Sequence, residues 1–187
     1  MGNINNVYYN RYFTMRKIIQ GVILIAFSLS MTLLIAGVIR KILKEKRIDE
    51  KMELLPSFSF MTMTRDDFHS SEIKNGPVLI VRFHPECDHC QYEISQIFRS
   101  DIPAIVSKAL LISSAHPDSI SNFLKQFNYS EYSSVVVLAD TSDSFGSIFG
   151  KDIVPSNYIY NRELKLVKVL SGEVKTETIR KYLHIGE

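Results

Sequence analysis

The chain has 187 residues, among them 22 Lys and Arg, 20 Asp and Glu and two cysteines. This length suits one globular domain with an appendage. Residues 1–51 hold nine basic and three acidic residues, whereas residues 52–187 hold 13 and 17, so the basic excess belongs to the N-terminal part. Because the remainder is net negative and has no cluster of Lys or Arg, it offers no footprint for nucleic acid, and no nucleic-acid partner is expected.

The first predicted element is a transmembrane helix at residues 18–39, a run of 22 residues without a charge. At 1.5 Å per residue such a helix is about 33 Å long, enough to cross a hydrocarbon core of about 30 Å. We therefore predict an uncleaved signal anchor. A cleaved signal peptide is the first alternative, but its apolar region usually has about 7–15 residues and ends at a small-residue cleavage site, which does not follow here. A buried helix of a soluble protein is the second alternative.

The span would divide the chain into an N-terminal flank (1–17), the signal anchor (18–39), a juxtamembrane linker (40–55) and a folded domain (56–187). Within about fifteen residues of the span, three Lys or Arg precede it and six follow it. Taken alone, this distribution places the folded domain in the cytoplasm, because positively charged flanks stay on that side of the membrane.

The folded domain is expected to alternate strands with helices, because continuous or alternating apolar runs indicate strands and apolar residues three and four apart indicate helices. The predicted elements are an edge strand at 58–62, a strand at 78–83, a helix from Cys87 with Cys90, Ile94, Ile97 and Phe98 on its inner face, a strand at 109–113, a helix opened by Pro117 with Ile120, Phe123, Leu124 and Phe127 on one face, a strand at 134–139, a short helix before Gly150, paired strands at 156–160 and 164–170, and a helix at 175–183. Pro103 is expected to end the region after the first of these helices. This order predicts an α/β sheet with helices on both faces.

Cys87 and Cys90 stand at C-x-x-C spacing where a predicted strand passes into a helix. The unpaired N–H groups and positive dipole end of a helix favour a thiolate at that point, which is the form that attacks a disulfide. Cys90 falls on the apolar face, so Cys87 is the thiol presented to partners. A structural disulfide across so short a loop would stabilise little, and a zinc site would have to draw its other two ligands from His84 and His89. Redox chemistry is therefore favoured, with metal binding and an inert pair as alternatives.

The two residues between the cysteines, Asp88 and His89, are candidates for tuning the pair. His89 would stabilise the Cys87 thiolate and so make the couple more oxidising. Asp88 would act in the opposite direction by raising the pKa of the neighbouring thiol, and it is also placed to accept the Cys90 proton. The alternative for both is an exposed residue in the first turn of a helix.

Several of these features together resemble the thioredoxin superfamily, and most closely its membrane-anchored TlpA/ResA-type thiol-disulfide oxidoreductases. They are the strand before Cys87, the C-x-x-C motif at a helix start, the Val154-Pro155 pair 65 residues after Cys90, the hairpin and the final helix. From the sequence alone Pro155 is either a turn proline or a candidate cis proline. The resemblance implies a thioredoxin-like fold, a central mixed β-sheet flanked by helices. It further implies that Cys87 attacks, that Cys90 resolves, that Pro155 is a cis proline beside the pair, and that the Val154 backbone binds substrate.

The sequence also departs from related patterns. Many members of the superfamily carry Trp before the first cysteine, where this chain has Glu86 and contains no Trp at all. A peroxiredoxin would need a Thr three residues before Cys87, and the copper-chaperone relatives use C-x-x-x-C spacing. The acidic Glu86 leaves the identity of the partner and the reduction potential open.

The function that the resemblance implies is disulfide exchange between Cys87/Cys90 and thiol- or disulfide-containing proteins, with reduction of the partner as the favoured direction. No cofactor and no metal are expected. The predicted location is a bacterial inner (cell) membrane, crossed once, with the domain on the extracytoplasmic side, against the Lys/Arg count. The alternatives are a copper- or zinc-binding protein on the same scaffold and a redox-inactive peptide-binding module.

Overall fold

The computed structural model describes residues 21–40 and 52–185. The chain divides into two compact units, Met1–Arg47 and Ile48–Glu187. Within the first, Gly21–Arg40 is a single helix with a mean hydropathy of 2.6 in its most apolar window, none of which is buried. By length and composition this helix can cross a membrane, a property that it shares with signal sequences.

Parts of the predicted domain division fall outside the described residues. These are the flank 1–17, the first three residues of the span 18–39, residues 41–51 of the linker, and the last two residues of the domain 56–187.

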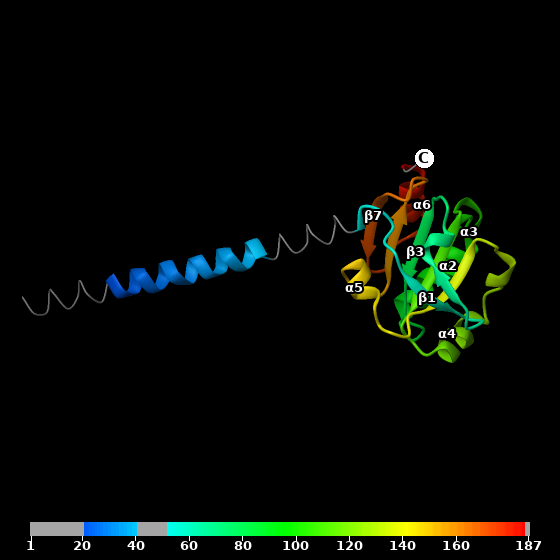
Figure 1. Ribbon diagram of the computed structural model, residues 1–187, viewed down its shortest axis with the longest axis horizontal. Helices are drawn as coiled ribbons and strands as arrows, with labels where there is room; N and C mark the ends of the chain where they lie inside the picture. The colour runs from blue at the N-terminus through cyan, green and yellow to red at the C-terminus, as the bar shows by residue number, and fades with distance from the viewer. Residues whose placement is uncertain (1–20, 41–51, 186–187) are drawn as a thin grey trace, which may run out of the picture. The chain divides into compact units, whose positions relative to one another are not determined.

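The second unit is built on one seven-stranded mixed sheet with the strand order β2-β1-β5-β4-β3-β6-β7. Figure 1 shows the sheet with helices packed against it. Its strands are β1 (Ser59–Thr62), β2 (Asp67–His69), β3 (Val78–Arg82), β4 (Lys108–Ser113), β5 (Val135–Ala139), β6 (Ser156–Tyr160) and β7 (Leu166–Ser171). The three central strands β3, β4 and β5 run parallel, and all other pairs are antiparallel. Strand β3 is buried along its whole length, as its continuous apolar run predicts.

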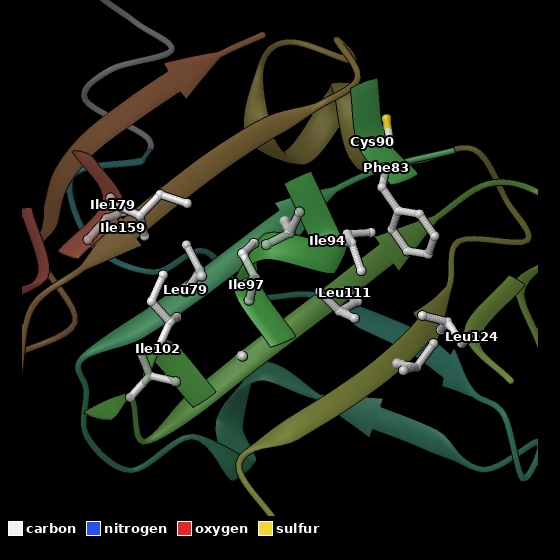
Figure 2. Close-up of a cluster of buried hydrophobic side chains, with 14 of the residues drawn as sticks. Leu79, Phe83, Cys90, Ile94, Ile97, Ile102, Leu111, Leu124, Ile159 and Ile179 are labelled. Atoms are coloured by element: carbon white, nitrogen blue, oxygen red, sulfur yellow. The ribbon is translucent and has the colours of Figure 1, made fainter. Parts of the chain in front are cut away.

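Helices cover both faces of this sheet, as the alternation of elements predicts. They are α2 (Asp88–Arg99), α3 (Ile102–Ile105), α4 (Pro117–Leu124), α5 (Phe145–Phe149) and α6 (Thr176–Ile185), with 3-10 turns at η1 (Ser70–Glu72) and η2 (Tyr129–Glu131). One hydrophobic cluster joins α2, α3, α4 and α6 to Leu79 and Val81 of β3, and Figure 2 shows Ile94 and Ile97 of α2 lying over Leu79 and Leu111. The other joins α5 and the N-terminal strands to Val78 and Ile80.

The predicted edge strand at 58–62 is not an edge, because β2 pairs on its outer side with Phe60 opposite Phe68. Arg65 makes the reversal possible. Its φ of 69° lies in the left-handed region, and its N–H donates to the Thr62 carbonyl at 3.1 Å.

Besides shifts of one or two residues at the ends of other elements, three further differences from the predictions have a physical reason. Pro103 does not end the helical region but lies in the first turn of α3, where its missing N–H costs no hydrogen bond. Phe127 lies beyond α4, although its ring still stacks on Phe98 at 5.0 Å between centroids. The second hairpin strand begins at Leu166 because Leu164, with φ 60°, belongs to the turn.

Candidate active site

Cys87 is the N-cap residue of α2, at the point where the chain leaves the central strand β3. Its backbone is extended, with φ −90° and ψ 112°, and its Sγ accepts a hydrogen bond from the Cys90 N–H at 3.3 Å. A sulfur thus takes the place of the side-chain oxygen that usually caps a helix and satisfies one of the unpaired N–H groups. The fold therefore fixes this sulfur at the positive end of the helix dipole.

The two cysteines are free thiols with their Sγ atoms 2.6 Å apart. Cys87 is half-buried, whereas Cys90 is 0% exposed and belongs to the hydrophobic cluster under α2. Figure 2 shows Cys90 at the start of that helix, beside Phe83. At this separation the two sulfurs can form a disulfide when an oxidant, such as a partner's disulfide, takes up two electrons and the two thiol protons leave.

Burial raises the pKa of the Cys90 thiol, and the hydrogen bond that it donates to Cys87 raises it further. Cys90 therefore holds its proton at neutral pH. One thiol is thus half-exposed and accepts two hydrogen bonds from Cys90, whereas the other is buried and protonated. The apolar pattern of the helix predicts this difference in burial.

Glu93 is a buried carboxyl group that the sequence reasoning missed. It lies on α2 one turn after Cys90, and its side chain is 0% exposed. Its Oε1 accepts from Nδ2 of Asn157 at 2.9 Å, and its Oε2 accepts from the Val174 N–H at 2.7 Å. Burial raises the pKa of Glu93, and these two hydrogen bonds act in the opposite direction.

A signal for Glu93 does exist in the sequence. The inner face of α2 carries Cys90, Ile94 and Ile97, and a charged residue three positions after Cys90 lies within that stripe. The charge of Glu93 also contributes to the raised pKa of Cys90, so the carboxyl group and the thiol interact. Glu93 is thus a buried ionisable group on the same helix as the cysteine pair.

Asp88 and His89 are both exposed in the first turn of α2. His89 lies with its Nδ1 2.6 Å from Oε2 of Glu173, in the loop between β7 and α6. Within the described residues, the carboxylate that faces His89 at ion-pair distance is that of Glu173. The tuning roles of Asp88 and His89 stay predictions.

Pro155 lies immediately before β6, and its bond to Val154 is cis. Strand β6 pairs with β3 so that Ser156 is opposite Arg82. Because of this pairing, Val154 and Pro155 lie at the end of the sheet where β3 stops and the chain continues to Cys87. Val154 is 38% exposed, and the Pro155 carbonyl accepts from the Gly172 N–H at 2.8 Å.

Across residues 21–40 and 52–185, the structure contains no group of three or more His, Cys, Asp or Glu that could hold a metal ion. The two histidines nearest the cysteines make other contacts. Nδ1 of His84 accepts from the Glu86 N–H at 3.2 Å, and His89 pairs with Glu173.

The two thiols are expected to differ in reactivity. In the full chain at pH 7.5, iodoacetamide should alkylate a Cys90→Ser variant, which keeps Cys87, at least about tenfold faster than a Cys87→Ser variant, because the remaining thiol of the latter is buried and protonated. The rates are measured by mass spectrometry of the intact protein. Equal rates would contradict the assignment of the exposed and shielded thiols.

Glu93 is expected to make stability depend on pH. Its pKa is higher in the folded than in the unfolded protein, so the folded state binds more protons, and the free energy of unfolding falls as the pH rises from about 4.3 through the raised pKa. Glu93→Gln removes this dependence, at the constant cost of one acceptor facing the Val174 N–H. Thermal midpoints are measured from pH 4 to 8 by circular dichroism. As the pH rises, the midpoint of the wild type should fall relative to that of Glu93→Gln, so that the two become equal or the variant becomes the more stable protein. Glu86→Gln, in an exposed residue, is the matched control, and equal slopes for both variants would refute the prediction.

No protein-family model matches the chain, and no curated protein matches it. Solved structures do resemble it. A putative thiol:disulfide interchange protein DsbE from Chlorobium tepidum is 13% identical, with a TM-score of 0.61 over 72% of this chain and 95% of its own. A secreted disulfide oxidoreductase of Mycobacterium tuberculosis, homologous to E. coli DsbE, is 13% identical, with a TM-score of 0.60 over 73% of this chain and 98% of its own.

A third structure, the peroxidoxin BcpB from Mycobacterium tuberculosis, is 14% identical, with a TM-score of 0.55 over 70% of this chain and 92% of its own. At these identities the likeness concerns the fold, and it includes proteins of more than one chemistry. The expected fold class is confirmed: the chain has a thioredoxin-like fold, a mixed sheet with helices on both faces.

Proposed function

We propose that this protein is a thiol-disulfide oxidoreductase that exchanges a disulfide between Cys87/Cys90 and partner proteins. The observation that carries the proposal is the pair of free thiols with sulfurs 2.6 Å apart, one half-exposed at a helix N-terminus and the other buried. The thioredoxin-like fold and the names of the DsbE-like neighbours, a disulfide interchange protein and a disulfide oxidoreductase, support it.

The reaction proceeds in two balanced steps. The Cys87 thiolate attacks one sulfur of the partner's disulfide, so that a mixed disulfide forms and the partner's other sulfur leaves as a thiolate. Cys90 then loses its proton and attacks the Cys87 sulfur. The products are the Cys87–Cys90 disulfide and a partner with two thiols, which has gained two electrons. The same steps in reverse donate a disulfide.

Glu93 is the group that takes the Cys90 proton in this scheme. It is buried on the same helix, one turn away, and its raised pKa makes it a stronger base than an exposed carboxylate. It replaces Asp88, the acceptor suggested by the sequence, because Asp88 is exposed whereas the Cys90 thiol is buried.

We infer that the protein acts as a reductase, with the TlpA/ResA-type resemblance as the main support. The structure adds one argument. Nδ1 of His89 lies 2.6 Å from Oε2 of Glu173, so this ring nitrogen is not available for a hydrogen bond to the Cys87 thiolate, which is one way in which His89 would make the couple more oxidising. Repeated turnover then requires a dithiol donor that reduces the Cys87–Cys90 disulfide.

We also propose the membrane arrangement that the sequence predicts. Residues 18–39 anchor the chain, residues 1–17 and 40–55 flank the anchor, and the domain 56–187 lies outside the cytoplasm of a bacterium. The length and apolarity of Gly21–Arg40 support the anchor, and the side of the membrane follows the resemblance alone.

Trapping tests the chemistry. In cells that produce the full chain, Cys90→Ser should accumulate mixed disulfides through Cys87, because no resolving thiol remains to release the partner. The complexes are counted on non-reducing gels after acid quenching. Cys87→Ser/Cys90→Ser is the control, and a Cys90→Ser variant that traps no more partner than this control would contradict the proposal.

Reporter fusions test the membrane side. Alkaline phosphatase fused after Glu187 should be active and β-galactosidase at the same position inactive, since the former enzyme works outside the cytoplasm and the latter inside. The reverse pattern would place the domain in the cytoplasm, in agreement with the Lys/Arg count.

A further inference from the structure

Arg82 is a buried cation at the end of β3, five residues before Cys87. Its side chain is 1% exposed, and it lies on the face of the sheet opposite the cluster around Cys90. Its guanidinium carbon lies 4.8 Å from the centre of the Phe145 ring. A charge in such a place is costly unless it is paired with good geometry.

The partner of Arg82 is Asp152, seventy residues further along the chain. Nε of Arg82 donates to Oδ1 of Asp152 at 2.6 Å, and Nη2 donates to Oδ2 at 3.1 Å. This bidentate arrangement fixes both the distance and the orientation of the carboxylate. Nη2 also donates to Oγ of Ser114 at 3.0 Å.

The two other nearby carboxylates are held less directly. Asp140 is 3.9 Å from Nη1 and already accepts from the N–H groups of Ser144 and Phe145 at the start of α5. Asp143 is 3.8 Å from Nη2 with a side chain that is 76% exposed. Asp152 therefore accepts two of the three side-chain hydrogen bonds that Arg82 donates, and Ser114 accepts the third.

Asp152 belongs to the loop 151–155, which carries Val154 and Pro155. Residues 151–154 of this loop are exposed. Besides the ion pair, side-chain hydrogen bonds from Tyr158 to the Lys151 carbonyl and from Ser156 to the Ile153 carbonyl hold the loop. Both of these donors lie on β6 itself. In the described part of the chain, the Arg82–Asp152 pair is the side-chain contact that ties this loop to β3, the strand leading to Cys87.

We propose that Arg82 and Asp152 are positioning residues: they hold the loop 151–155 in a fixed position relative to Cys87 and thereby set the affinity for protein disulfides. The inference rests on the proposed function. It assigns a specific role to a buried charge that an apolar side chain would replace at lower cost if only packing were required. Neither residue touches the reacting sulfurs in this scheme.

The test compares a protein substrate with a small disulfide. The full chain in detergent is assayed for reduction of insulin with dithiothreitol as donor, and for reaction of its reduced form with Ellman's reagent, which needs no loop contact. Asp152→Asn should raise KM for insulin at least about tenfold, because small displacements of substrate-positioning groups are costly. Its kcat, its rate with Ellman's reagent and the equilibrium constant of its cysteine pair with glutathione, which reports the reduction potential, should stay within about twofold of the wild type.

Asp143→Asn is the matched control, since it also removes a carboxylate near Arg82 but lies outside the loop, and its KM should not change. If Asp152→Asn fails to fold because Arg82 is left unpaired, Arg82→Met removes the charge and should raise KM in the same way. An unchanged KM, an equal rise in Asp143→Asn, or a parallel change in the small-disulfide rate and potential would overturn the inference. Wild-type protein that does not reduce insulin would instead contradict the proposed function.

Discussion

The site depends on the pairing of β3, which is hydrogen-bonded to β4 on one side and to β6 on the other and is buried on both faces. Two neighbours fix its register, and a slip of one residue would turn every side chain to the opposite face. Because the register is fixed, the chain leaves β3 at one defined point toward Cys87. Strand β6 begins at the same end of the sheet, with Pro155 just before it. The hydrogen bonds between β3 and β6 thus position both the cysteine pair and the loop 151–155.

Polar groups inside the fold connect this ladder to the surface segments around the site. Glu93 binds Asn157 of β6 and the backbone of Val174, so α2 is joined to β6 and to the β7–α6 loop. Arg82 joins the other face of β3 to the loop before β6. Each of these groups would be costly if left unpaired. Because a displaced partner would leave a buried charge without its hydrogen bonds, Glu93 and Arg82 favour one arrangement of the segments that they join.

The sequence predicts the parts of this structure that have a local pattern. The apolar runs locate β3, β4 and β5, and the periodicity of α2 separates the buried Cys90 from Cys87. Strand β2 was missed because three residues with one buried side chain carry no periodicity. Glu93 and Arg82 were missed because a charged residue ordinarily indicates exposure, and their partners lie 64 and 70 residues away.

The sulfur that caps α2 links helix stability to redox chemistry. Cys87 accepts the Cys90 N–H as an N-cap, and a sulfur bonded to a second sulfur in a disulfide is a weaker acceptor than a thiolate. Oxidation therefore weakens the first turn of the helix. The loss of an oxygen cap costs about 1 kcal/mol, and a difference of that size corresponds to about 20 mV for a two-electron couple. Any residue that stabilises the start of α2 in the reduced form thus lowers the tendency of this pair to stay oxidised, even if it never contacts a sulfur.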